Sequence, residues 1–291
     1  MFEPINNKEK VHHMFKRRPF IWGVVFALGL LALPLLIILP LALIGGFGEV
    51  SFGQQNFSFN TNLDFGNIVF WTLSSMFGIW ILGAVLQTNG LKFVFSLKGF
   101  GKGMLALSPI IVMVVVISFV FVDEIGIYFD LVAYFPFIII NEFARVLQEE
   151  ILFRGVLMTA VLIKLSPKWD KKTERIIYTF IFAVIFGLVH FVGGWYGILT
   201  GFFLGFLICA SYIYAKNLLA CIIVHLMANT LPTIIVGIIS GNFDLLERLS
   251  ILPYPSEIPL FIVFWIIQII TAVILIIKAK PFVPVSEYEN I

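Results

Sequence analysis

The sequence predicts an all-α fold, a polytopic membrane helix bundle of about eight transmembrane helices. Of its 291 residues, 60% are hydrophobic and only 12% are charged, and the mean hydropathy is +1.03. A soluble globular protein carries about 25% charged residues. Half that share, together with long apolar runs, is typical of chains whose helices cross a bilayer. We therefore expect no separate soluble domain.

The apolar runs predict eight spans that can cross a hydrocarbon core about 30 Å thick. The fourth span is unusually long, and Pro136 near its start is a candidate break in the helix. A short tether at 193–194 predicts that the fifth and sixth spans form an antiparallel hairpin. The expected spans are residues 20–44, 67–87, 104–122, 131–163, 175–192, 195–215, 217–240 and 258–278.

Basic residues alternate between the loops that join these spans. The N-terminal tail, the second loop and the fourth loop are rich in Lys and Arg, whereas the first and third loops contain neither. Cytoplasmic loops carry an excess of basic residues, so this pattern predicts both termini in the cytoplasm. The expected organisation is a basic cytoplasmic tail (1–19), transmembrane helices 1–3 (20–125), a transmembrane core with the polar motifs (126–240), and a last transmembrane helix with a cytoplasmic tail (241–291).

Several function classes lack their sequence signals. The chain has no P-loop, no GxGxxG and no CxxC pair, and its lysines are scattered at loop ends. Scattered lysines of this kind indicate membrane topology, so we expect no nucleic-acid partner. Cys209 and Cys221 both lie in apolar segments, which favours two core cysteines over a disulfide framework.

Three of the apolar segments nevertheless carry ionisable side chains. A carboxylate at the centre of a membrane helix costs about 2.5–3.5 kcal/mol on insertion scales. Chains rarely bear that cost in three separate helices without a functional use, so these residues form a candidate site. They are Glu149, Glu150 and Arg154 in the fourth span, His190 in the fifth, and His225 in the seventh, where the polar but neutral Asn229 follows it.

Helix geometry predicts that these groups lie at overlapping depths. At 1.5 Å per residue, Glu149 and His190 each lie about 22 Å from the cytoplasmic end of their helix. His225 and Asn229 lie about 14 and 20 Å from theirs. These two residues are four apart and therefore share one helix face. We expect the three helices to bring their polar groups to one place.

The two adjacent glutamates are expected to have different roles. Glu150 and Arg154 are four residues apart in the acid-first order, which favours an internal ion pair with a structural role. Glu149 lies about 100° further round the helix and is the candidate for chemistry. Arg145 is four residues before Glu149 and is an alternative partner for it.

The motifs, in this order and in an eight-span chain, resemble the CPBP family. That family comprises type II CAAX prenyl endopeptidases and bacteriocin-processing or Abi-type intramembrane metalloproteases. Its pattern is EExxxR, then FxxxH, then Hxxx followed by Asn or another small polar residue. The pattern reads here as Glu149-Glu150…Arg154, Phe186…His190 and His225…Asn229, and it covers roughly residues 130–240.

The resemblance implies an intramembrane endopeptidase and a role for each motif. Glu149 would be the general base, and His190 would orient or bind the attacking water. His225 and Asn229 would donate to the oxyanion, for which one donor contributes about 2.7–4 kcal/mol. Glu150 and Arg154 would support the site. Zinc is the metal that Glu149, His190 and His225 would suit, but no HExxH motif is present and metal participation stays open.

The resemblance also implies the partners and the location. The expected partners are membrane lipid and a hydrophobic or lipidated peptide, as in bacteriocin or signal-peptide processing or self-immunity. The Phe- and Ile-rich chain suggests a bacterial plasma membrane. Two alternatives remain: a non-catalytic membrane scaffold or regulator of the same family, and a proton-coupled transporter that uses Glu149 and the histidines as a relay. The oligomeric state is left open.

Overall fold

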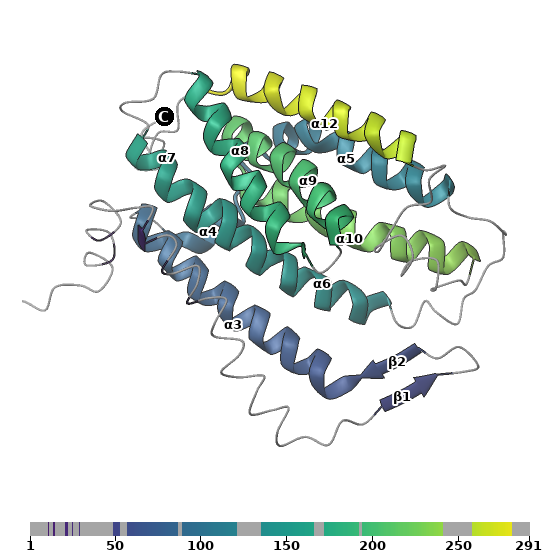
Figure 1. Ribbon diagram of the computed structural model, residues 1–291. Coiled ribbons are helices and arrows are strands. Elements are labelled where there is room, and N and C mark those ends of the chain that lie inside the picture. Colours follow the sequence, from purple (N-terminus) through teal and green to yellow (C-terminus); the bar gives the residue numbers. More distant parts are fainter. Residues whose placement is uncertain are drawn as a thin grey trace, which may run out of the picture.

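The computed structural model shows a bundle of long helices preceded by one short hairpin (Figure 1). The described residues are 49–52, 57–86, 89–120, 135–165, 172–191, 194–240 and 258–280, with single positions at 11, 14, 21, 22, 25 and 29. The predicted first span, 20–44, lies outside these ranges except at those single positions. The cytoplasmic placement of the termini stays a prediction.

Each of the other seven predicted spans is a helix in the described ranges. Four of these helices, α3, α5, α9 and α12, have an apolar stretch long enough to cross a membrane, and the apolar parts of α8 and α10 are shorter. The helices are α3 (Thr61–Leu86), α4 (Gly90–Val94), α5 (Phe100–Val120), α6 (Phe135–Glu150), η2 (Ile151–Met158), α7 (Thr159–Leu165), α8 (Lys172–Val189), α9 (Gly194–Ala215), α10 (Leu218–Ser240) and α12 (Ile258–Lys278).

A short antiparallel hairpin departs from the all-α prediction. β1 (Glu49–Phe52) pairs with β2 (Phe57–Asn60), and Val50 lies opposite Phe59. Both strands are rich in Val and Phe, which favour extended structure, and each is too short to show a helical period. The hairpin lies in the predicted first loop and leads directly into α3, so it interrupts none of the described helices.

The fourth predicted span is one long helix with a π-helical middle. α6 passes into the eight-residue π-helix η2 and then into α7. Pro136 is in the first turn of α6, where its missing N–H removes no helix hydrogen bond, so it does not break the described helix. Long π-helical runs are rare, and π-helical turns occur frequently at functional sites. The run begins directly after Glu149 and Glu150.

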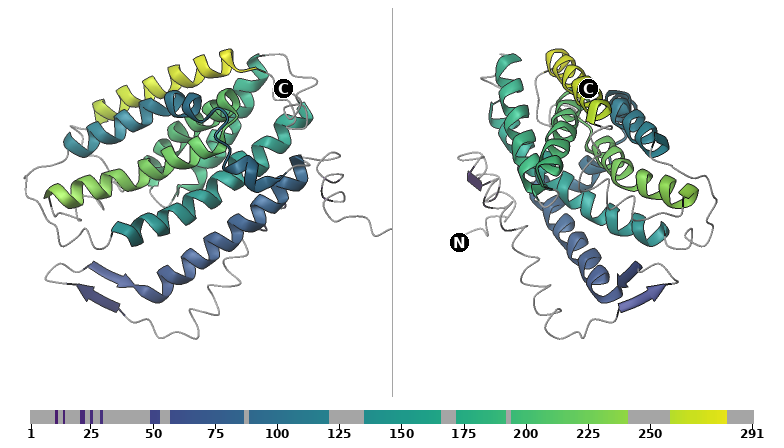
Figure 2. Two further views of the ribbon diagram at one scale, coloured as in Figure 1. Left: turned by 180° about the vertical axis from the view of Figure 1, so that it is seen from behind. Right: turned by 45° about the vertical axis from the view of Figure 1, so that its right-hand side comes forward.

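The long helix is enclosed by its neighbours. α3 packs against α6 and η2, α10 packs against both α5 and α6, and α9 lies between α8 and α12 (Figures 1 and 2). Every residue of η2 is buried, including Arg154. The interior of the bundle is therefore built around the segment that carries the first polar motif.

Asn217 fixes the start of α10, the helix that carries His225. Its Oδ1 accepts a hydrogen bond from the Ala220 backbone N at 2.7 Å and so caps the helix. Its Nδ2 donates to the carbonyl oxygens of Ser96 at 2.7 Å and Lys98 at 2.9 Å. Lys216 completes the connection with a φ of 54°. α10 is thus anchored two turns before His225.

Glycines allow α8 and α9 to pack closely. A Cβ on Gly187 would lie 2.7 Å from the Ile198 carbonyl oxygen, and a Cβ on Gly205 would lie 2.8 Å from Cδ1 of Phe186. A Cβ on Gly201 would lie 3.1 Å from the His190 ring. Gly201 and Gly205 form a GxxxG that serves packing inside the bundle, and it faces the FxxxH motif.

We expect Gly187→Ala to destabilise the bundle, because the new methyl group would meet backbone of α9. Overpacking of this kind costs about 1–3 kcal/mol, measured as the free energy of unfolding in detergent. Gly101→Ala is the matched control, because nothing lies within 4 Å of a Cβ at that helical position. Equal stability of the two variants would contradict the close contact of α8 with α9.

Candidate active site

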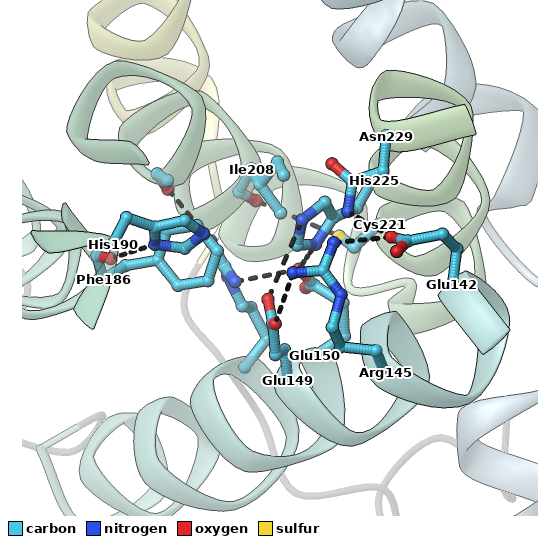
Figure 3. Close-up of polar contacts among 12 residues, drawn as sticks. Glu142, Arg145, Glu149, Glu150, Phe186, His190, Ile208, Cys221, His225 and Asn229 are labelled. Atoms are coloured by element: carbon cyan, nitrogen blue, oxygen red, sulfur yellow. Dashed lines mark hydrogen bonds and ion pairs between the residues drawn. The ribbon is translucent and has the colours of Figure 1, made fainter. Parts of the chain in front are cut away.

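Polar side chains from α6, η2 and α10, together with His190 directly after α8, gather inside the bundle (Figure 3). The side chains of Glu150 and Arg154 are 0% exposed, that of His225 is 1% exposed and that of Glu149 is 18% exposed. Most of the group is thus closed off by protein, and Glu149 lies on its more open side.

The ion pair expected between Glu150 and Arg154 is present and fully buried. Arg154 Nη1 donates to Glu150 Oε1 at 2.8 Å, and Arg154 Nη2 donates to the Gly205 carbonyl oxygen at 3.4 Å. The guanidinium also lies 4.2 Å from the centre of the Phe186 ring. Since a buried charge without its partner is strongly unfavourable, each member of the pair depends on the other.

His225 is joined to this ion pair through Glu150. Its Nδ1 lies 2.8 Å from Glu150 Oε1, the same oxygen that receives Arg154. A carboxylate only accepts hydrogen bonds, so Nδ1 carries the proton and Nε2 is left for other partners. That Nε2 lies 3.8 Å from Glu149 Oε2. Glu150 is therefore more than a partner for Arg154, because it also sets the orientation of the His225 ring.

Glu149 points away from Glu150, as its place on the helix predicts. Its Oε1 lies 3.7 Å from Arg145 Nη1. Its Oε2 is a buried atom without a hydrogen-bond partner among the described residues. Buried carboxylate oxygens almost always have a partner, so this oxygen is suited to a water molecule or a substrate group.

Asn229 contacts Glu142, a residue that belongs to none of the three sequence motifs. Its Nδ2 donates to Glu142 Oε2 at 3.3 Å, and the same oxygen accepts from Arg145 Nη2 at 2.5 Å. Glu142, Arg145 and Glu149 follow one another at spacings of three and four, so they share one face of α6. That spacing is the sequence signal by which Glu142 can be found.

His190 directly follows α8, and Phe186 on that helix fixes its position. Its Nδ1 donates to the Phe186 carbonyl oxygen at 2.7 Å, which leaves Nε2 with a lone pair when the ring is neutral. The Phe186 ring lies 4.6 Å from the His190 ring and 5.7 Å from the His225 ring, between centroids. Phe186 therefore packs against both histidines. Figure 3 shows His190 to one side of the glutamates.

The described residues do not form a ready metal site. No group of three or more His, Cys, Asp or Glu side chains within them is placed to hold a metal ion. Glu149, His190 and His225, the set that would suit zinc, are thus not gathered as ligands.

We expect Glu150→Gln to lower the free energy of unfolding by about 3–5 kcal/mol, because it leaves Arg154 charged and unpaired in the interior. The double variant Glu150→Gln/Arg154→Met should recover most of that loss. Denaturant unfolding in detergent measures both. A loss below about 1 kcal/mol in the single variant, as for an exposed pair, would contradict the buried geometry.

One comparison with known proteins bears on this site. Residues 131–231 match the model of the family described as type II CAAX prenyl endopeptidase Rce1-like, and all three polar motifs lie in that segment. No curated protein and no solved structure matches the chain. Residues 131–231 are thus similar to the Rce1-like family of CAAX proteases, and the apolar helices of the described ranges indicate an integral membrane protein.

Proposed function

We propose that this protein is an intramembrane endopeptidase that hydrolyses a peptide bond with a water activated by Glu149. One observation carries the proposal. Glu149 Oε2 is buried without a hydrogen-bond partner among the described residues, and it lies 3.8 Å from His225 Nε2. Two groups at that separation can both reach one oxygen atom placed beside them. The family match supports a hydrolase of this class.

The reaction begins with the water. Glu149 Oε2 accepts one proton from the water. The lone pair on His190 Nε2 accepts a hydrogen bond from the other proton of the water and so orients the molecule. The water oxygen attacks the carbonyl carbon of the peptide bond, and the carbonyl oxygen becomes an oxyanion. Glu149 then passes the proton to the amide nitrogen, the C–N bond breaks, and an acid and an amine leave.

His225 and Asn229 are proposed to stabilise the oxyanion. They are four residues apart on α10 and therefore present their polar groups on one face. Asn229 Nδ2 has two protons, of which Glu142 takes one. His225 can donate from Nε2 only as the doubly protonated ring, because Nδ1 is already committed to Glu150. Glu150 already pairs with Arg154, so the second carboxylate beside such a ring is Glu149, whose Oε2 lies 3.8 Å from His225 Nε2.

The proposed substrate is a hydrophobic or lipidated peptide that reaches the site through the membrane. The helices around the site carry large apolar side chains on their outer surfaces, among them Phe180, Ile181 and Leu188 on α8. Such surfaces suit lipid, and a peptide with an apolar anchor enters the same phase. Processing of secreted signal or bacteriocin peptides, or immunity to them, at a bacterial plasma membrane fits this chemistry.

We expect Glu149→Gln to abolish cleavage, because the amide cannot accept the proton. General-base contributions are about 10²- to 10⁴-fold, so the rate should fall by at least about 10²-fold. The measurement is cleavage of a fluorogenic lipopeptide panel by detergent-purified protein. Gln148→Leu is the matched control, since Gln148 is the neighbour of Glu149 on α6 and its Nε2 has no hydrogen-bond partner among the described residues. Undiminished cleavage by Glu149→Gln would refute the mechanism.

A separate test concerns the oxyanion donors. Asn229→Leu should lower kcat by about 10²- to 10³-fold with little change in KM, because the amide acts only as charge develops on the oxygen. Full kinetics on the best peptide of the panel separate the two constants. A rise in KM at unchanged kcat would instead place Asn229 in ground-state binding.

A further inference from the structure

We propose that Glu142 is a positioning residue that orients the Asn229 amide and holds Arg145 off Glu149. The inference rests on the proposed function, because it assigns to Glu142 a task in the same reaction. Its basis is the geometry of one carboxylate oxygen, Glu142 Oε2, which links α6 to α10 at the open side of the site (Figure 3).

The first part of the task is the orientation of the Asn229 side chain. An amide group has a donor side and an acceptor side, and it can present either one to its surroundings. A carboxylate only accepts, so the contact of 3.3 Å from Nδ2 to Glu142 Oε2 requires the donor side to face Glu142. The second proton on Nδ2 is then available to an oxyanion. Without Glu142, a rotation of the amide would turn its oxygen toward the developing negative charge.

The second part of the task is competition for Arg145. The guanidinium reaches both acids, but it lies 2.5 Å from Glu142 Oε2 and 3.7 Å from Glu149 Oε1. A close arginine–carboxylate pair is a strong, charge-assisted contact that makes the carboxylate a poorer acceptor of a further proton. Glu142 takes the shorter contact, and Glu149 is left with one oxygen free of hydrogen bonds to the described residues.

The exposure of these side chains agrees with a role at the mouth of the site. It rises from 0% for Glu150 to 18% for Glu149, 21% for Glu142 and 36% for Arg145. A partly exposed ion pair contributes only about 0–1 kcal/mol to stability. A contribution to stability is thus a weak explanation for the presence of Glu142 and Arg145 in an apolar bundle. Their contacts with Asn229 and Glu149 give a stronger explanation.

The test compares Glu142→Gln with the double variant Glu142→Gln/Arg145→Gln, using the most rapidly cleaved peptide. Glu142→Gln keeps the shape of the side chain but removes its charge, so Arg145 is free to close on Glu149. The new side chain can present either its oxygen or its NH2 to Asn229, so it no longer forces the donor side of that amide to face it. We expect kcat to fall by about 10-fold to 10³-fold, where the upper value corresponds to the complete loss of one oxyanion donor. KM should stay within about twofold of the wild-type value. The double variant should be faster than the single one, because no guanidinium remains to close on Glu149.

Two controls separate this role from a structural one. Unfolding in detergent must give similar stability for the wild type and both variants, so that kcat refers to folded protein. Gln148→Leu lies on the same helix but about 240° round from Glu142, and it should keep wild-type kinetics. A double variant no faster than Glu142→Gln, or a matched rise in KM, would overturn the inference.

The outcomes also distinguish this inference from the proposed function. Wild-type kinetics of Glu142→Gln, alongside an inactive Glu149→Gln, would overturn the positioning role and leave the endopeptidase standing. Cleavage by Glu149→Gln, or no cleavage by the wild type on any peptide of the panel, would overturn the proposed function and the positioning role with it.

Discussion

The buried ion pair of Glu150 and Arg154 is the constraint on which the rest of the site depends. Both side chains are fully enclosed, so neither charge is stable without the other. Glu150 Oε1 also receives His225 from α10, while Arg154 reaches the Gly205 carbonyl on α9 and the Phe186 ring on α8. One electrostatic requirement therefore ties four segments of the bundle together and sets the orientation of a proposed catalytic ring.

The π-helix is the backbone counterpart of this pair. Its hydrogen bonds span one residue more than those of an α-helix, and runs of this length are rare. Here all eight residues are buried, and the Thr159 hydroxyl donates to the Arg154 carbonyl at 2.8 Å and lies 2.6 Å from Tyr212 Oη.

The site is closed on one side and open on the other. Glu150, Arg154 and His225 form the closed side, where a low-dielectric surrounding strengthens each electrostatic contact. Glu142 and Arg145 lie toward the open side, and Glu149 stands between the two groups with one contact to each. A carboxylate in that position meets a substrate from the open side while the closed side holds its neighbours in place.

The sequence by itself determined the features that depend on local spacing and on partition between water and lipid. Hydropathy and charge indicated membrane helices, and a spacing of four indicated the pair of Glu150 and Arg154. The three motifs indicated the family. Only the tertiary structure decided which side chains meet between helices, because periodicity leaves the rotation of each helix about its axis undetermined. The bonds from Glu150 to His225 and from Glu142 to Asn229 join residues 75 and 87 positions apart. The π-helix likewise depends on enclosure by neighbouring helices, which no local pattern encodes.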